Sequence, residues 1–346
     1  MPDVVLTVAG KQYAGWQQIE IRRGIEQVAG TFELSVTDRW AGTEQAWPIQ
    51  KGDACTVTAD GDLLISGYVD DVLPFFDADQ HGITVVGRDK TADLVDCSAI
   101  VKSGEWRGRT LLQVAKDIAG PFGIDVRAET DVGEPFKTAA LQEGETAWEA
   151  LERAARMRAV LMVSDAAGGL VITRAGTQRV AAVLAQGKNI LAARGAFSMR
   201  DRYSEYICKG QNTGFDYSTP EQNAQPKATA QDLQVGRYRP LIIVAEDIAD
   251  TQGLKARALW EAAVRMGRSS RPQITVQGWR HGAGLWLPNT LVPVDCPYMY
   301  LSIDMLIVAV TYRIDDAGTL AHLELCRPEA FALLPVPEED KEGLGL

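Results

Sequence analysis

The strongest constraint on the fold is a period-two alternation of apolar and polar residues, which recurs in short runs near both ends of the chain. Ile19–Arg22 and Phe32–Thr37 alternate in this way, so one face of each strand lies on a core and the other faces water. Farther along, Asp60-Gly61 separates two more such runs and tolerates the positive φ of a tight hairpin turn. Because several short strands at this spacing are typical of small barrels and sandwiches, the first hundred residues are predicted to form a β-domain.

The pattern changes to helical spacing after about residue 98. Apolar residues from Leu111 to Ile118 recur at helical intervals, with Thr110 as the N-cap and Gly120-Pro121 as the stop. Thr146, followed three residues later by Glu149, is a capping box that predicts the start of a second helix. A hairpin is expected to follow over 160–173. We therefore predict a compact α/β insert over residues 99–190.

Strand-like sequence returns after residue 191 and continues to Leu325, with a third helix predicted at about 252–266. The stretch 210–236 is long and polar, and is expected to be a loop that either contacts a partner or is disordered. The predicted division is a first β-barrel domain over 1–98, the insert over 99–190, a second β-barrel domain over 191–333 and an acidic tail over 334–346. The fold class is α+β and β-rich, with two similar tube-type β-barrels.

A weak internal repeat supports the pair of barrels. Two segments share the order of a tryptophan, a proline, a strand pair, an apolar strand and a final arginine. The first runs from Trp47-Pro48 to Arg88, and the second from Trp286-Leu287-Pro288 to Arg327. We interpret them as homologous barrels; the alternative is chance, since β-proteins share such composition.

The composition is that of an ordinary globular protein, with 46% hydrophobic and 23% charged residues. A formal charge of −11 opposes tight nucleic-acid binding, which depends on lysine and arginine neutralising phosphates. The chain shows neither a membrane-length apolar run nor a signal peptide, so we expect that it is made and kept in a cytosol, without insertion into a membrane. The cysteines form no C-x-x-C pair and are expected to be reduced and mostly buried; they are Cys55, Cys97, Cys208, Cys296 and Cys326.

The motifs of common enzyme classes are missing. The sequence has no G-x-S-x-G elbow, no H-E-x-x-H and no phosphate loop. The isolated histidines His81, His281 and His322 would have to come together from distant segments to bind a metal. Asp70 and Asp71 are strand neighbours that point to opposite faces and cannot converge on one bond. We predict no catalytic residues, no cofactor and no metal site.

Two residue groups have several interpretations. The cluster of Arg265, Arg268, Arg271 and Arg280 is a solvated face, a source of salt bridges between subunits or a phosphate site, in decreasing order of expectation. Most of the tryptophans are expected in the core rather than on a binding surface. They are Trp47, Trp106, Trp148, Trp260, Trp279 and Trp286.

The run from Gly87 to Ala99, GRDKTADLVDCSA, closely resembles the Mu-like phage baseplate hub family. Shorter matches follow in family order, and together they cover roughly Val4 to Pro335. They are Gly144–Ala147, Ile172–Gly176, Arg237–Leu241, Thr275–Arg280 and Arg327–Phe331.

The resemblance implies a structural protein of a contractile phage tail, located in the virion baseplate and assembled in the cytoplasm of the bacterial host. It implies a homotrimeric ring in which two barrels per chain alternate around the axis, adapting a sixfold tail tube to a threefold spike. The implied partners are the tail tube protein, the trimeric spike protein and other baseplate proteins. DNA is expected to pass through the bore without specific binding, and the family suggests no catalytic residues.

Two other functions stay open. One is the hub of a type VI-like injection machine, which a fused spike domain or effector would distinguish; the end of this sequence at residue 346 favours the separate phage hub. The other is a tail-associated cell-wall hydrolase, which requires a catalytic carboxylate in a cleft.

Overall fold

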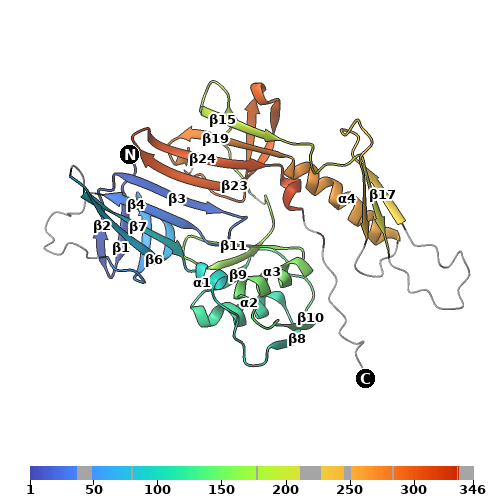
Figure 1. Cartoon of the computed structure of the whole chain (residues 1–346), viewed down its shortest axis with the longest axis horizontal. Helices are drawn as coiled ribbons and strands as arrows, with labels where there is room; N and C mark the ends of the chain where they lie inside the picture. Colours follow the sequence, from blue (N-terminus) through green and yellow to red (C-terminus); the bar gives the residue numbers. More distant parts are fainter. Residues whose placement is uncertain are drawn as a thin grey trace, which may run out of the picture. The chain divides into compact units, whose positions relative to one another are not determined.

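The computed structural model describes residues 1–36, 49–78, 81–176, 178–210, 227–244, 251–282, 284–332 and 334 (Figure 1). The chain divides into two compact units. Unit 1 contains residues 1–193 and 273–325, and unit 2 contains residues 194–272 and 326–346. Trp47-Pro48 of the predicted repeat and nearly all of the predicted acidic tail lie outside the described residues.

Unit 1 is built on a large, mostly antiparallel sheet, with strand order β15-β19-β24-β23-β3-β4-β7-β6-β5-β1-β2. These strands are β1 (Val4–Val8), β2 (Lys11–Tyr13), β3 (Gln18–Gly24), β4 (Thr31–Val36), β5 (Ala54–Ala59), β6 (Asp62–Phe76), β7 (His81–Asp89), β15 (Ile190–Phe197), β19 (Ser270–Gln277), β23 (Leu301–Asp315) and β24 (Gly318–Cys326). β22 (Thr290–Cys296) pairs with β23, and the short β13 (Gln178–Arg179) and β14 (Leu184–Ala185) pair with β22 in parallel. β20 (Arg280–His281) and β21 (Gly284–Leu285) form a separate small hairpin, and the 3₁₀ turn η2 spans Pro297–Met299. β15 and β19 both run across the boundary between the units.

Alternating side chains build the core, as the sequence predicts. In β4, Phe32, Leu34 and Val36 are buried while the residues between them are not. The same apolar cluster extends from Val4 to Leu325, so strands from both ends of the chain share one core. The predicted Asp60-Gly61 turn joins β5 to β6, and both residues have positive φ, 50° and 85°.

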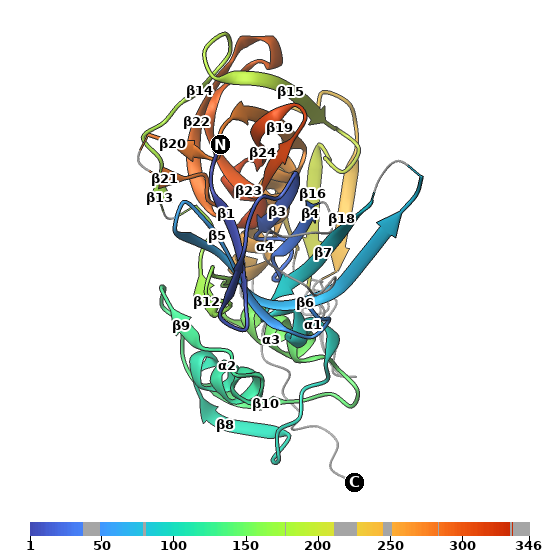
Figure 2. The same cartoon turned by 90° about the vertical axis from the view of Figure 1, so that its left-hand side faces the viewer.

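Two sets of strands repeat the same arrangement. β5, β6 and β7 are 6, 15 and 9 residues long, and β22, β23 and β24 are 7, 15 and 9 residues long. In each set the long strand pairs with the short strand before it, and a further strand flanks the last: β4 pairs with β7, and β19 pairs with β24. We name β3-β4-β7-β6-β5 the N-terminal set and β15-β19-β24-β23-β22 the C-terminal set. β6 and β7 extend past the neighbouring strands as a hairpin (Figure 2).

The two sets join edge to edge within one chain. The C-terminal part of β23, Ala309–Ile314, pairs antiparallel with Ile19–Gly24 of β3. The observed architecture is thus β-rich, as predicted, but it is one continuous sheet, and no pairing within the described residues closes either set into a barrel.

The insert follows the N-terminal set in the chain. It contains α1 (Ala92–Asp96), β8 (Glu105–Arg109), α2 (Leu111–Ala119), the 3₁₀ turn η1 (Gly120–Phe122), β9 (Val126–Ala128), β10 (Phe136–Ala140), α3 (Ala147–Met157), β11 (Leu161–Ser164) and β12 (Leu170–Thr173). Both predicted helix starts are confirmed, since capping boxes are formed by Thr110 with Gln113 and by Thr146 with Glu149. The predicted hairpin is β11–β12. α2 and α3 pack side by side over a core of their own (Figure 1).

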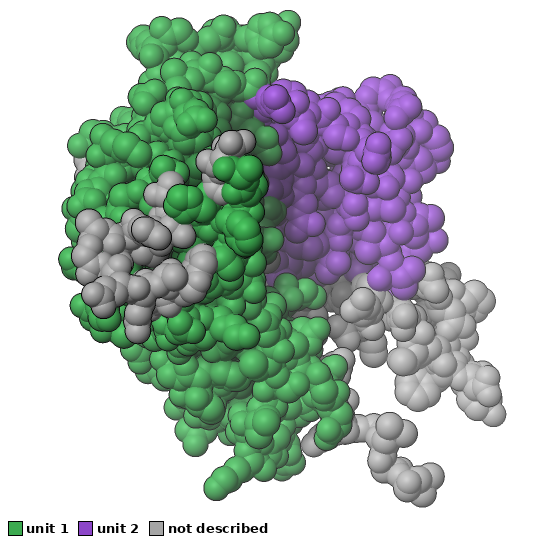
Figure 3. All heavy atoms as spheres, turned by 60° about the vertical axis from the view of Figure 1, so that its left-hand side comes forward, with its two compact units in different colours: residues 1–193, 273–325 green, residues 194–272, 326–346 purple. Residues whose placement is uncertain are grey.

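Unit 2 is a small α/β body (Figure 3). Its sheet has the order β17-β16-β18, formed by β16 (Glu205–Lys209), β17 (Lys227–Gln231) and β18 (Pro240–Val244). α4 (Thr251–Arg268), the predicted third helix, packs on this sheet and on the 3₁₀ turn η3 (Pro328–Phe331). The stretch 210–236 is therefore not loop throughout. Residues 227–231 form a strand because β16 supplies backbone partners that a polar sequence does not reveal.

Candidate functional site

The run from Gly87 to Ala99 lies where the N-terminal set passes into the insert. It covers the end of β7, all of α1 and the turn that follows. Its centre is Asp89, whose residue is only 2% exposed, and Thr91, which is completely buried. A buried carboxylate is costly unless hydrogen bonds satisfy it, so the surroundings of Asp89 show what this segment does.

Asp89 accepts hydrogen bonds from several parts of unit 1. Its Oδ2 accepts a hydrogen bond of 2.6 Å from the Gly30 backbone, and its Oδ1 accepts bonds of 2.9 and 2.5 Å from the backbone and hydroxyl of Thr91. The Thr91 hydroxyl also lies 3.2 Å from the Val28 carbonyl. Burial raises the pKa of Asp89, and hydrogen bonds from Thr91, Gly30 and the Ser164 side chain oppose that rise. Asp89 thus links the β3–β4 turn, the end of β7 and strand β11 of the insert. We name this contact region the Asp89 joint.

Close backbone approaches at this joint admit only glycine. A Cβ on Gly67 would lie 1.9 Å from the Arg88 carbonyl oxygen. One on Gly168, in the β11–β12 turn, would lie 2.5 Å from the Ser66 carbonyl oxygen. The Ser66 carbonyl also accepts a 3.1 Å bond from the Lys90 backbone. The insert therefore packs on β6 through backbone, which fixes its position more tightly than side chains alone would.

Arg88 connects β6 with α1 on the more exposed side of this joint. Its guanidinium donates to Asp70 from Nε at 2.7 Å and to Asp96 from Nη2 at 2.7 Å. These hydrogen bonds raise the pKa of Arg88, and Arg88 lowers the pKa of Asp96. An open hollow of about 430 Å³ lies beside them, lined among others by Lys51, Tyr68 and Arg88. Asp70 is thus part of a bridge between β6 and α1, whereas Asp71 is exposed.

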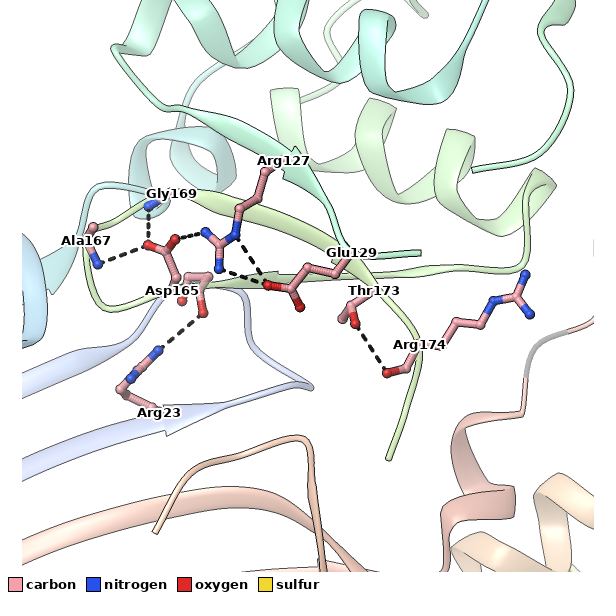
Figure 4. A network of polar contacts seen from close by, with 9 residues as sticks. Arg23, Arg127, Glu129, Asp165, Ala167, Gly169, Thr173 and Arg174 are labelled. Carbon is pink, nitrogen blue, oxygen red and sulfur yellow. Dashed lines mark hydrogen bonds and ion pairs between the residues drawn. The ribbon is translucent and has the colours of Figure 1, made fainter. Parts of the chain in front are cut away.

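A second set of polar contacts connects the insert with β3 (Figure 4). Arg23 of β3 donates to the Ser164 carbonyl at 3.4 Å. The neighbouring Asp165 accepts from the backbones of Ala167 at 2.9 Å and Gly169 at 2.8 Å, and it pairs with Arg127 of β9. These contacts fix the conformation of the β11–β12 turn, in which Gly168 packs against β6. The network therefore positions the insert and is not a reaction centre.

The other predicted residues are dispersed. His81, His281 and His322 lie in β7, β20 and β24, and His322 Nδ1 lies 2.9 Å from the Thr275 hydroxyl. Within the described ranges, no group of three or more His, Cys, Asp or Glu side chains has a geometry suited to a metal ion. No described helix is long and apolar enough to cross a membrane. All five cysteines are free, and all but Cys97 are buried, as predicted.

The arginine cluster and the tryptophans also separate. Arg265 belongs to unit 2 and pairs with Glu261 at 3.1 Å, whereas Arg280 belongs to unit 1 and pairs with Asp62. Trp106, Trp279 and Trp286 are core residues as predicted. Trp148 and Trp260 are half-buried, and Trp47 lies outside the described residues.

Two features escaped the sequence reasoning. Asp89 lies in a run of charged residues that resembles a solvated turn, and only its position at the end of an alternating strand signals burial. The end of β6 exposes Leu73, Phe75 and Phe76. A cluster of large apolar side chains before a hairpin turn was a readable sign of a contact surface.

Family models match consecutive parts of the chain. They are the Mu phage baseplate assembly protein GpP-like N-terminal domain over residues 3–89, the second domain of baseplate hub protein gp44-like proteins over 91–174, the third domain of tail protein NMB1110-like proteins over 202–259 and the fourth domain of GpP over 250–334. The first two models meet at Lys90, inside the Asp89 joint.

Individual relatives cover almost the whole chain. Baseplate hub protein gp44 of Escherichia phage Mu is 37% identical over 99% of this chain and 92% of its own length. The 43 kDa tail protein of prophage MuSo2 from Shewanella oneidensis superposes with a TM-score of 0.86 at 42% identity, over 96% of this chain and all of that one. At 10% identity, the type VI secretion component c3393 of E. coli, covering 96% of this chain and 77% of its own, shares the fold with a TM-score of 0.57. The length and identity of the first two matches establish that this chain belongs to the family of Mu-type phage baseplate hub proteins, which are structural components of the tail.

Proposed function

We propose that this chain forms a homotrimeric ring that adapts a sixfold tail tube to a threefold spike. The observation that carries the proposal is the repetition of one strand arrangement in the N-terminal and C-terminal sets. Three identical chains present six similar surfaces to a tube only if each chain carries two similar parts, while the opposite end stays threefold. In this proposal each set is the wall of one barrel-like segment of the ring.

The insert and unit 2 serve as the parts that break the sixfold pattern. The insert follows β7 in the N-terminal set, whereas the long segment of unit 2 lies between β15 and β19 of the C-terminal set. Each occurs once per chain, and so three times in the ring. We assign contacts with the spike and with other baseplate proteins to these parts, and contacts with the tube to the repeated sets.

The bore is proposed to pass DNA without binding it. Three chains of formal charge −11 carry −33 together. Like charge along a passage repels a polyanion and keeps it mobile. The role is proposed to be structural throughout, since the joint around Asp89 positions domains and the Thr91 hydroxyl that donates to Asp89 is completely buried, out of reach of a substrate.

The mass of the purified protein in solution, combined with electron micrographs viewed along the particle axis, tests the proposal. We expect three chains per particle, an axial image with six similar lobes and a superposition of the two sets by a rotation of about 60°. A monomer or dimer at assembly concentrations would contradict the ring. Clearing of peptidoglycan that a single carboxylate substitution abolishes would contradict the non-enzymatic role.

The fold shared with the type VI component makes a hub in such an injection machine the second candidate. Co-purification distinguishes the two. A phage hub is expected to retain a tube protein and a spike protein of its own phage when the whole tail operon is expressed. Retention of a type VI spike or effector instead would favour the second candidate.

A further inference from the structure

We propose that the C-terminal half of β6 pairs with strand β15 of a second copy of this chain, in the way that β23 pairs with β3 inside one copy. The inference rests on the proposed ring and adds the strands that close it.

The long strands of the two sets differ in how far their outer edges are paired. In β23, Leu301–Leu306 pair with β22, and Ala309–Ile314 then pair with β3. In β6, Asp62–Tyr68 pair with β5, and the hydrogen bonds of this edge end at Val69, which bonds to Gly52 and Asp53. Beyond that point, Asp71–Phe76 pair with β7 alone among the described strands. The half of β6 that corresponds to the β3-binding half of β23 therefore has an open edge.

The counterpart of β3 also has an open edge. β3 lies between β4 and β23, whereas β15 is the terminal strand of the sheet and pairs with β19 alone among the described strands. β15 occupies in the C-terminal set the place that β3 occupies in the N-terminal set. Within its described residues, one chain thus contains both halves of a second junction without their strand partners, beside one complete junction.

Burial separates the complete junction from the open edges. At the β23–β3 junction, Ile314, Tyr312 and Ile21 are almost completely buried. On the open half of β6, Leu73 is 51%, Phe75 48% and Phe76 87% exposed. On β15, Leu191 and Phe197 are more than half exposed. When the partner strand is absent, a strand-to-strand interface leaves large apolar side chains exposed. Both open edges carry such side chains.

Charge favours this pairing, and the one proline on the open half of β6 does not forbid it. Exposed Asp71 on β6 and exposed Arg194 on β15 carry opposite signs. Pro74 lacks an N–H and removes one donor from β6. A proline inside a paired strand has a precedent here, because Pro293 lies in β22 opposite Asp304 of β23.

The contact is head-to-tail, because each copy offers β6 to one neighbour and β15 to the other. Such contacts generate either a closed ring or an open filament. In a ring of three, three β23–β3 junctions within chains alternate with three β6–β15 junctions between chains, so the sheet continues around the whole ring. This arrangement also covers the open edges of β6 and β15.

The test places a photo-crosslinking benzoylphenylalanine at Phe76 in unlabelled chains, mixed before assembly with ¹⁵N-labelled wild-type chains. After illumination, mass spectrometry of the digested trimer is expected to find unlabelled β6 peptides joined to labelled peptides that contain residues 190–197. The matched control carries the same group at Ile100, which is 84% exposed and lies outside both strands. It should yield no crosslink to residues 190–197.

A second measurement replaces exposed side chains with charges. The double variant Leu73→Asp, Phe75→Asp is expected to raise the trimer dissociation constant at least tenfold, while Ile100→Asp leaves it unchanged; circular dichroism checks that each variant is folded. A trimer whose Phe76 crosslinks all fall outside residues 190–197 would overturn the strand pairing and leave the ring intact. A wild-type protein that stays monomeric would overturn the ring itself and the pairing with it.

Discussion

Arg202 and Asp232 form a buried two-point ion pair in unit 2, with Nε and Nη2 of the arginine each 2.8 Å from a carboxylate oxygen. Their side chains are only 6% and 8% exposed. Gln234 accepts a further bond of 2.7 Å from the guanidinium, and the Arg239 side chain donates to the Arg202 carbonyl at 3.0 Å. The pair therefore holds together the segment before β16 and the segment after β17.

Removing one partner of this pair should be costly. Asp232→Ala leaves the Arg202 guanidinium buried without its counter-charge, and we expect a loss of about 3–5 kcal/mol in the free energy of unfolding. Urea denaturation measures the loss. The matched control is Asp304→Ala, because Asp304 makes the same two-point pair with Arg179 at the surface, where the side chains are 54% and 41% exposed. A similar loss in both variants would show that burial is not the cause.

The Asp89 joint predicts a specific pH dependence. Because burial raises the pKa of Asp89, the folded protein keeps a proton between the unfolded value of about 3.9 and the raised value, whereas the unfolded chain has lost it. The contribution of this group to stability therefore falls as pH rises through that window. Asp89→Asn should remove this dependence and cost about 1–3 kcal/mol at neutral pH, since one oxygen can no longer accept. Urea denaturation of both proteins from pH 4 to 7 tests this, and parallel curves would contradict it.

Gly67, at the Asp89 joint, should tolerate no side chain. Gly67→Ala places a Cβ against the Arg88 carbonyl, and we expect a loss of at least about 3 kcal/mol because backbone must move. Gly284→Ala is the control, since nothing lies within 4 Å of its Cβ position and its φ is not in the left-handed region. Melting temperatures report the difference. Equal melting temperatures for the two variants would show that the β6–β7 backbone can relax without cost.

Two histidines should destabilise the protein on mild acidification. Burial lowers the pKa of His281 and of His322, and nearby Arg313 lowers that of His322 further. As pH falls below about 6.5, the unfolded chain binds protons on these histidines before the folded chain does. The contribution of the two neutral histidines to the free energy of unfolding is therefore complete above about pH 6.5 and is lost as pH falls through their pKa values in the folded protein. The double variant His281→Phe, His322→Gln should show a flatter decline in unfolding free energy between pH 7 and 5. An unchanged slope would assign the decline to other groups.

Local signals in the sequence were enough to place α2, α3 and α4, whereas the short α1 was not predicted. Thr110 and Thr146 start helices because each capping interaction involves residues three apart, which a sequence shows directly. The strand at 227–231 was missed because its stability comes from pairing with β16, about twenty residues earlier in the chain. The role of Asp89 was missed for the same reason: its donors include Gly30, which lies 59 residues away. The two separate barrels remain a proposal, since pairing of β23 with β3 merges the two sets into one sheet.

The β23–β3 junction also sets the order in which the chain can mature during synthesis. Arg22 of β3 contacts Thr311 of β23 across a separation of 289 residues. The first strands leave the ribosome long before their partner exists, so the edge of β3 stays open for most of translation. At a rate of about 5–20 residues per second, this interval lasts roughly 15–60 seconds. Throughout it, the nascent chain presents an unpaired strand edge, which is a template for pairing with another nascent copy.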